Sequence, residues 1–125
     1  VEVKFILQGI KDKKAAYALA KSHYSSLVRA GVKIYEYTPG FVHAKVFVSD
    51  DVKAVVGTIN LDYRSLYHHF ECGTFLYRTA CIADIERDFQ DNLAKCRQGT
   101  SESIQKEKMS YKLVGSVMKF IAPLM

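Results

Sequence analysis

Five polar side chains at fixed spacing give this chain its candidate chemistry. An imidazole with an ordinary pKa of ~6.5 can act as a nucleophile or as a general acid near neutral pH. A lysine ammonium, a threonine hydroxyl and an asparagine amide can all donate hydrogen bonds to the oxygens of a phosphate group. The sequence therefore predicts a phosphate cradle with a reactive histidine, which needs no metal ion or other cofactor. Its residues are His43, Lys45, Asp50, Thr58 and Asn60.

The element that must position these side chains is a strand predicted over residues 42–49. Side chains alternate between the two faces of a strand, so His43 and Lys45 are expected on one face, roughly 6 to 7 Å apart. An Asp-Asp turn at Asp50 then leads to a partner strand at 52–56. Because Asp50 lies at that turn, we expect a structural or ion-pairing role for it rather than contact with phosphate.

Two interpretations of this motif compete. A lone His-x-Lys pair most often occupies the solvent face of an edge strand and has no catalytic role. The complete spacing, which continues through Gly57, Thr58 and Asn60, is expected by chance in roughly one chain in 10⁵ of this length. Gly57 also permits a close approach of backbone at the turn before Asn60. The joint pattern favours the catalytic interpretation.

The remaining sequence predicts an α/β protein with a mixed sheet. Further strands are expected at 1–7, 32–37 and 70–77. A helix capped by Asp12 and ended by Gly31 is expected between the first two of these strands. Its apolar positions are Ala16, Leu19, Ala20, His23, Tyr24 and Leu27, with His23 expected to pack.

A second helix is predicted from Ala80 to Arg97. Acidic residues stand near its beginning and basic residues near its end, an order that suits the helix dipole. One apolar face is expected, formed by Ile82, Ile85, Phe89, Leu93 and Cys96.

Composition limits the possible classes of protein. A chain of 125 residues with 49% hydrophobic and 25% charged residues is long enough for one folded domain. The net charge of +5 permits an anionic partner but does not choose among phosphate esters, nucleic acid and an acidic membrane surface. No apolar run reaches the ~18 to 20 residues needed to cross a bilayer, and no signal peptide is present. The chain begins at Val1 inside a strand-like run without an initiator Met, so we expect a fragment or a processed product.

Redox and metal chemistry find little support in the sequence. Three cysteines without a CxxC pair argue against a disulfide framework or a cysteine zinc site, and they fit a reducing compartment. His68 and His69 are adjacent but lack a matching carboxylate or cysteine cluster. They are therefore interpreted as surface or loop histidines rather than metal ligands.

The five polar residues and Gly57 resemble the HxK(x)4D(x)6G[ST]xN motif of the phospholipase D superfamily, which the sequence matches at every fixed position. The wider context is similar to bacterial cardiolipin synthases in particular. It comprises Ala30-Gly-Val-Lys-Ile-Tyr-Glu-Tyr37, Pro39-Gly40-Phe-Val-His43, Asn60-Leu-Asp62-Tyr-Arg64-Ser65 and His69-Phe-Glu71. The resemblance covers residues from about 1 to 97. It implies the phospholipase D-like α/β/α sandwich, here truncated at its N-terminus.

The resemblance implies a two-step displacement at phosphorus through a phosphohistidine. One imidazole attacks a phosphodiester, a second histidine protonates the leaving alcohol, and a new hydroxyl or water then takes the phosphoryl group. Lysine and asparagine hold the charge that builds on the phosphoryl oxygens. Such enzymes need two facing motifs and this chain has one, so the other comes from an upstream half of the same polypeptide or from a second copy. In a two-motif enzyme His43 is expected to be the general acid and base, with the nucleophile upstream.

The resemblance also implies supporting residues. Thr58 and Asn60 are expected to bind phosphate. Glu71, on a predicted strand, is the candidate carboxylate that orients the histidine, and the alternative is an exposed strand glutamate. Asp62 and Arg64 are expected to pair and to support the loop after Asn60.

The tail departs from the core pattern. Residues 1–98 are expected to form the C-terminal part of a phospholipase D-like catalytic domain, and 99–125 a polar linker and an amphipathic C-terminal segment. Such a segment can lie on an anionic membrane with its lysines at the headgroups. The alternative is a helix packed on the protein or on a second copy.

Three functions follow as hypotheses. The first is the C-terminal catalytic half of a cardiolipin synthase, which joins two phosphatidylglycerols and releases glycerol. The parent protein is then expected at the cytoplasmic face of a bacterial cell membrane, with the fragment itself soluble and inactive without a second motif. The second is a single-motif phosphodiesterase or nuclease that acts as a homodimer, although no stripe of basic and aromatic residues favours nucleic acid. The third is an inactive fragment that binds lipid or dimerises.

Overall fold

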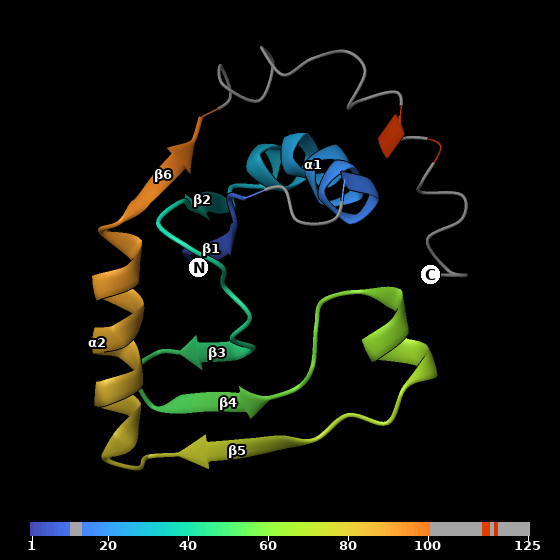
Figure 1. Ribbon diagram of the computed structural model, residues 1–125. Coiled ribbons are helices and arrows are strands. Elements are labelled where there is room, and N and C mark those ends of the chain that lie inside the picture. Colours follow the sequence, from blue (N-terminus) through green and yellow to red (C-terminus); the bar gives the residue numbers. More distant parts are fainter. Residues whose placement is uncertain (11–13, 101–113, 116, 118–125) are drawn as a thin grey trace. The chain divides into compact units, whose positions relative to one another are not determined.

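The computed structural model describes residues 1–10, 14–100, 114–115 and 117. They form two compact units. One holds Val1–Val42 together with the described residues from Lys95 onward, and the other holds His43–Ala94. Each unit has its own three-stranded sheet and its own α-helix (Figure 1).

The first unit is a β-α-β arrangement extended by a later strand. Its elements are β1 (Lys4–Gln8), α1 (Lys14–Arg29), β2 (Lys33–Tyr37) and β6 (Cys96–Gly99). β2 is central, because it pairs in parallel with β1 and antiparallel with β6. The mixed sheet and the α/β class are therefore confirmed. Gly31 follows α1 with a φ of 91°, a conformation that glycine adopts without strain.

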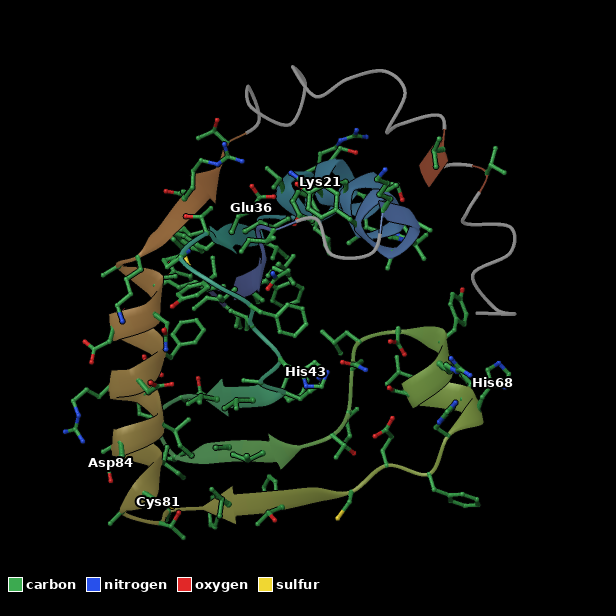
Figure 2. All side chains as sticks on the ribbon, viewed as in Figure 1. Lys21, Glu36, His43, His68, Cys81 and Asp84 are labelled. Atoms are coloured by element: carbon green, nitrogen blue, oxygen red, sulfur yellow. The ribbon has the colours of Figure 1, made fainter. Side chains whose placement is uncertain are left out.

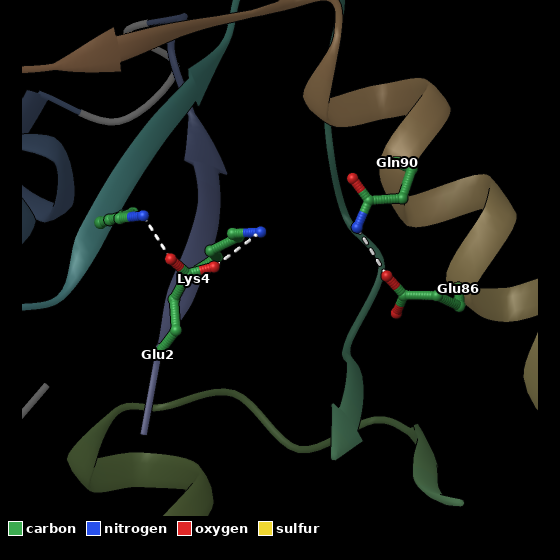
Figure 3. A network of polar contacts seen from close by, with 5 residues as sticks. Glu2, Lys4, Glu86 and Gln90 are labelled. Atoms are coloured by element: carbon green, nitrogen blue, oxygen red, sulfur yellow. Dashed lines mark hydrogen bonds and ion pairs between the residues drawn. The ribbon is translucent and has the colours of Figure 1, made fainter. Parts of the chain in front are cut away.

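An ionic contact fixes the beginning of β1 beside β2. The Glu2 carboxylate lies 2.9 Å from Lys4 Nζ and also accepts a hydrogen bond from Lys33 (Figure 3). These two ammonium groups lower the pKa of Glu2 to about 2, and Lys33 makes the largest contribution. Glu2 is therefore ionised throughout the neutral range. Because all three side chains are partly or largely exposed, salt screens this contact.

The interior of the first unit combines apolar side chains with a buried ion pair. Tyr24 of α1 and Ile34 of β2 are buried together. The Lys21 ammonium lies 2.6 Å from Glu36 Oε1, and these side chains are only 5% and 2% exposed (Figure 2). Arg97 of β6 lies opposite Glu36 in the sheet register and donates to its other carboxylate oxygen over 2.6 Å. α1, β2 and β6 therefore meet at one buried carboxylate.

The second unit is an antiparallel meander followed by a helix. Its elements are β3 (Val46–Ser49), β4 (Lys53–Gly57), the π-helix η1 (Arg64–His68), β5 (Gly73–Tyr77) and α2 (Cys81–Leu93). β4 is central and pairs antiparallel with both β3 and β5. Asp50 and Asp51 have φ values of 53° and 56°, the left-handed pair that a type I′ hairpin turn requires. The predicted hairpin is confirmed. Ala54 of β4 and Ile82 of α2 are buried in this unit.

Three strands begin clearly later than predicted, and β1 is one of them, since it begins at Lys4 rather than at residue 1. β3 begins at Val46 rather than at residue 42, and β5 begins at Gly73 rather than at residue 70. Glu71 therefore precedes its strand instead of lying on it. The alternation of apolar and polar residues continues in the sequence beyond the last residue that pairs with a neighbouring strand. It therefore cannot show where the strand ends.

The end of the second predicted helix was also wrong. α2 ends at Leu93, and Cys96 belongs to β6, which the sequence did not indicate. Along α2, Gln90 Nε2 donates to Glu86 Oε1 over 2.6 Å, an i,i+4 pair that supports the helix (Figure 3). The apolar periodicity of the sequence runs past this helix, whereas the pairing of β6 with β2 depends on residues about sixty positions away.

The buried face of α1 differs from the predicted one. Ala18, Lys21 and Tyr24 are buried, whereas Ala20 and His23 are exposed. The expected packing role of His23 is therefore wrong. The Lys21 face of α1 points inward because the Lys21 ammonium pairs with the buried carboxylate of Glu36. A pattern of hydrophobic residues in the sequence cannot indicate such an ion pair.

The predicted cap Asp12 and most of the C-terminal segment lie outside the described residues. Among the described helices, none is both long and apolar enough to span a bilayer. Gly115 is helical and buried, and a Cβ atom there would lie 2.6 Å from Ser22 Cβ and 2.7 Å from the Ala18 carbonyl oxygen. The backbone at Gly115 thus approaches α1 closely, which favours the packed-helix alternative at this point.

Replacing Glu36 with glutamine leaves the buried Lys21 ammonium without its countercharge. We expect Glu36→Gln to lower the free energy of unfolding by about 3–5 kcal/mol, measured by urea denaturation at pH 7. Asp84→Asn is the matched control, because it removes an exposed pair with Arg87 on α2 and should cost less than about 1 kcal/mol. Equal losses in the two variants would contradict the stabilising role of the buried pair.

The same pair predicts a pH dependence. Burial by itself raises the pKa of Glu36, but hydrogen bonds and positive charges from Lys21 and Arg97 outweigh burial and hold the pKa below its ordinary value of 4.5. A carboxyl with a lowered folded pKa stabilises the fold fully above its unfolded pKa and loses that contribution as pH falls through the folded pKa. The stability difference between the wild type and Glu36→Gln should therefore shrink below about pH 4.5.

Candidate active site

The histidine and lysine of the motif lie just before β3. The Gly57 N–H donates to the Lys45 carbonyl oxygen over 3.1 Å, which continues the backbone pairing of β3 and β4 by one step. Lys45 Nζ turns back to donate to the His43 carbonyl oxygen over 2.7 Å. His43 is exposed at the entrance to β3 (Figure 2). In place of the predicted projection from a strand, a local contact fixes the Lys45 ammonium beside the backbone of His43.

Thr58 joins the segment after β4 to the segment before β5. Its N–H donates to the Cys72 carbonyl oxygen over 2.9 Å, and the Cys72 N–H donates back to Thr58 Oγ1 over 3.1 Å. The Thr58 hydroxyl also donates to the Glu71 carboxylate. A hydroxyl carries one proton, and a carboxylate is a stronger acceptor than a carbonyl, so that proton is directed to Glu71.

Gly57 makes this junction possible. A Cβ atom at this position would lie 2.2 Å from the Cys72 carbonyl oxygen and 2.7 Å from Gly73 Cα. No real side chain tolerates such distances to backbone atoms. The close approach predicted at Gly57 is therefore confirmed, and the group that approaches is the backbone before β5.

The pKa of Glu71 lies below its ordinary value. The hydrogen bond from Thr58 is the largest cause, followed by one from Ser65; burial opposes both of these, and electrostatic interactions with His69 and Lys45 make smaller contributions that lower the pKa. Glu71 is thus an ionised carboxylate near neutral pH, fixed by two hydroxyl groups and within electrostatic reach of the lysine of the motif.

Asp50 lies at the opposite end of β3 from the histidine. Four strand residues at about 3.3 Å each separate it from Lys45 by more than about 13 Å along the strand. Its carboxylate accepts a hydrogen bond from Ser49 Oγ over 3.0 Å, and its backbone forms the hairpin turn. These contacts agree with the structural role expected for Asp50 and separate it from His43 and Lys45.

The loop between Asn60 and Glu71 contains a π-helix. Asn60 is exposed at its start. The predicted Asp62–Arg64 pair is wrong, because Asp62 Oδ1 accepts from the Ser65 N–H over 2.8 Å and Arg64 Nε donates to His69 Nε2 over 2.8 Å. A carboxylate at this position can either pair with Arg64 or accept a hydrogen bond from the backbone N–H that follows Arg64. The bond to the backbone forms here.

Ser65 is the supporting residue that the sequence analysis missed. It is buried, its N–H is capped by Asp62, and its hydroxyl contributes to the lowered pKa of Glu71. The spacing Asp-x-x-Ser is the signal that could have indicated this local cap. Within the described ranges, no group of three or more His, Cys, Asp and Glu side chains is arranged to hold a metal ion.

The arrangement can bind an anion and move a proton. The imidazole of His43 belongs to an exposed residue whose backbone carbonyl accepts from the Lys45 ammonium, and an ionised carboxylate lies within electrostatic reach of that ammonium. The first can take or give a proton near neutral pH, the second can balance a phosphate charge, and the third can orient a histidine.

Gly57→Ala should disrupt the junction between β4 and β5. Because the added Cβ meets backbone, we expect a loss of about 3 kcal/mol or more in unfolding free energy, at the upper end of overpacking effects. Gly40→Ala is the control, since the nearest atom to a Cβ there lies at an ordinary 3.9 Å. Thermal and urea unfolding of both variants measures the difference. An unchanged unfolding free energy in Gly57→Ala would show that the backbones at β4 and β5 can move apart without cost.

Thr58→Val should raise the pKa of Glu71 toward its ordinary value, because valine keeps the shape but removes the hydroxyl proton. The carboxyl ¹³C chemical shift of Glu71, followed by NMR across an acid titration, measures this change. Ser49→Ala removes a hydroxyl–carboxylate bond from the distant turn and should leave the Glu71 titration unchanged. An unchanged Glu71 titration in Thr58→Val would show that Thr58 is not the main cause of the lowered Glu71 pKa.

Comparison with known proteins shows the family to which the chain belongs. The family model described as "Cardiolipin synthase, PLD-like domain" matches residues 1–93. Over all 125 residues, the chain is 62% identical to an uncharacterized protein of Streptococcus mutans serotype c and covers 27% of that protein. It is 39% identical to a cardiolipin synthase of Clostridium perfringens and 33% identical to cardiolipin synthase 2 of Bacillus cereus, covering 26% and 24% of those proteins.

No solved structure matches the chain. The chain spans about a quarter of the length of the curated relatives it matches. The matched residues 1–93 include the whole motif from His43 to Asn60 and the carboxylate of Glu71. The chain therefore belongs to the cardiolipin synthase family of phospholipase D-like domains.

Proposed function

We propose that the chain supplies one histidine–lysine motif of a phosphatidyltransferase that makes cardiolipin. The observation that carries the proposal is the contact between Thr58, a fixed residue of the motif, and Glu71, whose carboxylate lies within electrostatic reach of Lys45. Thr58 and Lys45 of the motif and the carboxylate downstream are thereby linked within the second unit, whereas Asp50 lies apart from them. The family of the chain supports the same class of transfer.

The proposed reaction transfers a phosphatidyl group in two balanced steps. A histidine nitrogen attacks the phosphorus of one phosphatidylglycerol, the bond from phosphorus to the glycerol oxygen breaks, and a second histidine protonates that oxygen. The second histidine then takes the proton from a hydroxyl of another phosphatidylglycerol, which attacks the phosphohistidine. Cardiolipin and glycerol leave, and both imidazoles return to their starting state.

Each residue has a distinct role in this proposal. His43 is the general acid and base, and the nucleophilic histidine comes from a second motif, either in the same longer polypeptide or in a second copy. Lys45 and Asn60 donate to the phosphoryl oxygens as charge builds there. Glu71 orients a histidine, and Thr58 fixes Glu71. No step requires a metal ion or other cofactor.

The substrate implies a location for the longer protein. Phosphatidylglycerol is an anionic lipid of a bilayer, so the site must work at an anionic membrane surface. We place that surface at the cytoplasmic face of the bacterial cell membrane. The biosynthesis of a membrane phospholipid is then the role of the whole enzyme, in which this chain belongs to the C-terminal catalytic half and forms the C-terminal part of a phospholipase D-like α/β/α sandwich.

His43→Ala tests the mechanism directly. In the longer protein that carries a second motif, we expect cardiolipin formation from phosphatidylglycerol vesicles to fall by at least about 10²-fold, the usual contribution of a general acid or base. His23→Ala, which changes an exposed histidine of α1, is the matched control and should keep full activity. Cardiolipin appears on thin-layer chromatography of the extracted lipid.

The outcomes separate the competing functions. If His43→Ala still forms cardiolipin at the wild-type rate, His43 is not the general acid and base and the proposed mechanism is wrong. Cleavage of DNA by the 125-residue chain in the presence of a chelator would favour a homodimeric nuclease instead. Lack of any activity in a longer protein with two intact motifs would favour a lipid-binding or dimerising module.

A further inference from the structure

The chain that leads into His43 is held at the end of β1 by a glutamine side chain. The Val42 N–H donates to Gln8 Oε1 over 2.7 Å, in a partly buried contact between residues 34 positions apart in sequence. Gln8 is the last residue of β1, and Val42 is the residue directly before the candidate histidine. A side chain of the first unit therefore fixes the backbone at the position next to His43.

Gln8 is itself placed by strand pairing. It lies opposite Tyr37, the last residue of β2, in the parallel register. The N–H of the following Gly9 donates to the Tyr37 carbonyl oxygen over 2.9 Å, and a Cβ atom at Gly9 would lie 2.6 Å from that oxygen. The ends of the two strands therefore approach closely. The segment 38–42, which leaves β2 after Tyr37, returns to the end of β1 at Val42.

The chemistry of the amide group shows which atom of Gln8 matters. A backbone N–H can only donate, so the atom that faces Val42 must be the amide oxygen. Gln8 Nε2 is buried, and no hydrogen-bond acceptor for it lies in the part of the chain that the structure describes. A buried donor without an acceptor is costly, and an unbranched methionine would fill a similar volume without that cost. The contribution of glutamine at this position is therefore its acceptor oxygen.

His43 is held from its other side as well. Its carbonyl oxygen accepts from Lys45 Nζ over 2.7 Å, and the Lys45 carbonyl oxygen accepts from the Gly57 N–H over 3.1 Å. The backbone on both sides of His43 is thus hydrogen-bonded, while the residue itself is exposed. A catalytic group needs such fixed geometry, since a misplacement of about 1 Å can reduce a rate by about 10²-fold.

We infer that Gln8 is a positioning residue for His43, because its amide oxygen anchors the backbone that leads into this histidine. The inference rests on the proposed function, since it names what holds the general acid and base in place. Gln8 is not expected to touch lipid, because its oxygen is engaged with Val42 and its nitrogen is buried. It therefore acts on the rate of the transfer rather than on the binding of substrate.

Gln8→Met tests the inference in the 125-residue chain without any turnover. It removes the acceptor and keeps the length of the side chain, so the order parameter of the His43 backbone N–H, measured by ¹⁵N relaxation, should fall from about 0.85 to below about 0.6. Hydrogen exchange of the Val42 N–H should become at least about tenfold faster.

Two further variants make this measurement specific. Gln98→Met makes the same chemical change at an exposed position of β6 and should alter neither value. Gln8→Glu keeps a carboxyl oxygen as acceptor and should stay close to the wild type in both values. Circular dichroism confirms that each variant is folded.

Activity of the longer protein gives a second readout. Gln8→Met should lower kcat for cardiolipin formation by about tenfold and leave KM nearly unchanged, as misplacement of a catalytic group predicts. A wild-type order parameter at His43 in Gln8→Met, or a loss of order with unchanged kcat, would overturn the inference. A wild-type longer protein that forms no cardiolipin would overturn the proposed function instead, and the order parameter would still decide whether Gln8 positions His43.

Discussion

The site of this protein depends on the bond between the Thr58 hydroxyl and the Glu71 carboxylate. The two residues are thirteen positions apart in sequence, and two hydrogen bonds bring them together: the Thr58 N–H donates to the Cys72 carbonyl oxygen, and the Cys72 N–H donates to Thr58 Oγ1. Those bonds are possible only because Gly57 lets β4 and the segment before β5 approach closely. The glycine and the hydroxyl of one motif thus act first on the protein itself. They fix a negative charge that lies within electrostatic reach of the Lys45 ammonium.

A second set of charges organises the other unit by a different principle. Lys21 and Glu36 are removed from water, with the Lys21 ammonium also over the ring of Tyr24 at 4.7 Å. The desolvation of two charges is costly, so this pair defines which face of α1 turns inward more than it adds net stability. Arg97 of β6 donates a hydrogen bond to the same carboxylate, which joins β6 to this ion pair. The exposed contacts of Glu2, by comparison, fix only the edge of the sheet.

The sequence predicted the parts of the fold that rest on local signals. The Asp50-Asp51 hairpin and the helix ended by Gly31 follow from turn residues and short-range periodicity, whereas the pairing that makes the first sheet mixed involves β6. β6 could not be predicted, because Cys96 continues the apolar spacing of α2 while its strand partner lies far away in the chain. The burial of Lys21 depends likewise on a carboxylate in another element, Glu36 of β2. The motif predicted the residues of the candidate site, but their hydrogen-bond partners required the structure.

The π-helix has a consequence for how such a chain can change in evolution. Its i→i+5 closure at Arg64 and His69 accommodates one more residue than an α-turn of the same length. Both ends of the loop are fixed, one by the Thr58 junction and the other by Glu71. Related sequences are therefore free to exchange the outward side chains of this loop, whereas an insertion or deletion within it must rotate every following residue and shift Glu71 away from the hydroxyl groups that hold it. The length of the loop is under stronger constraint than its composition.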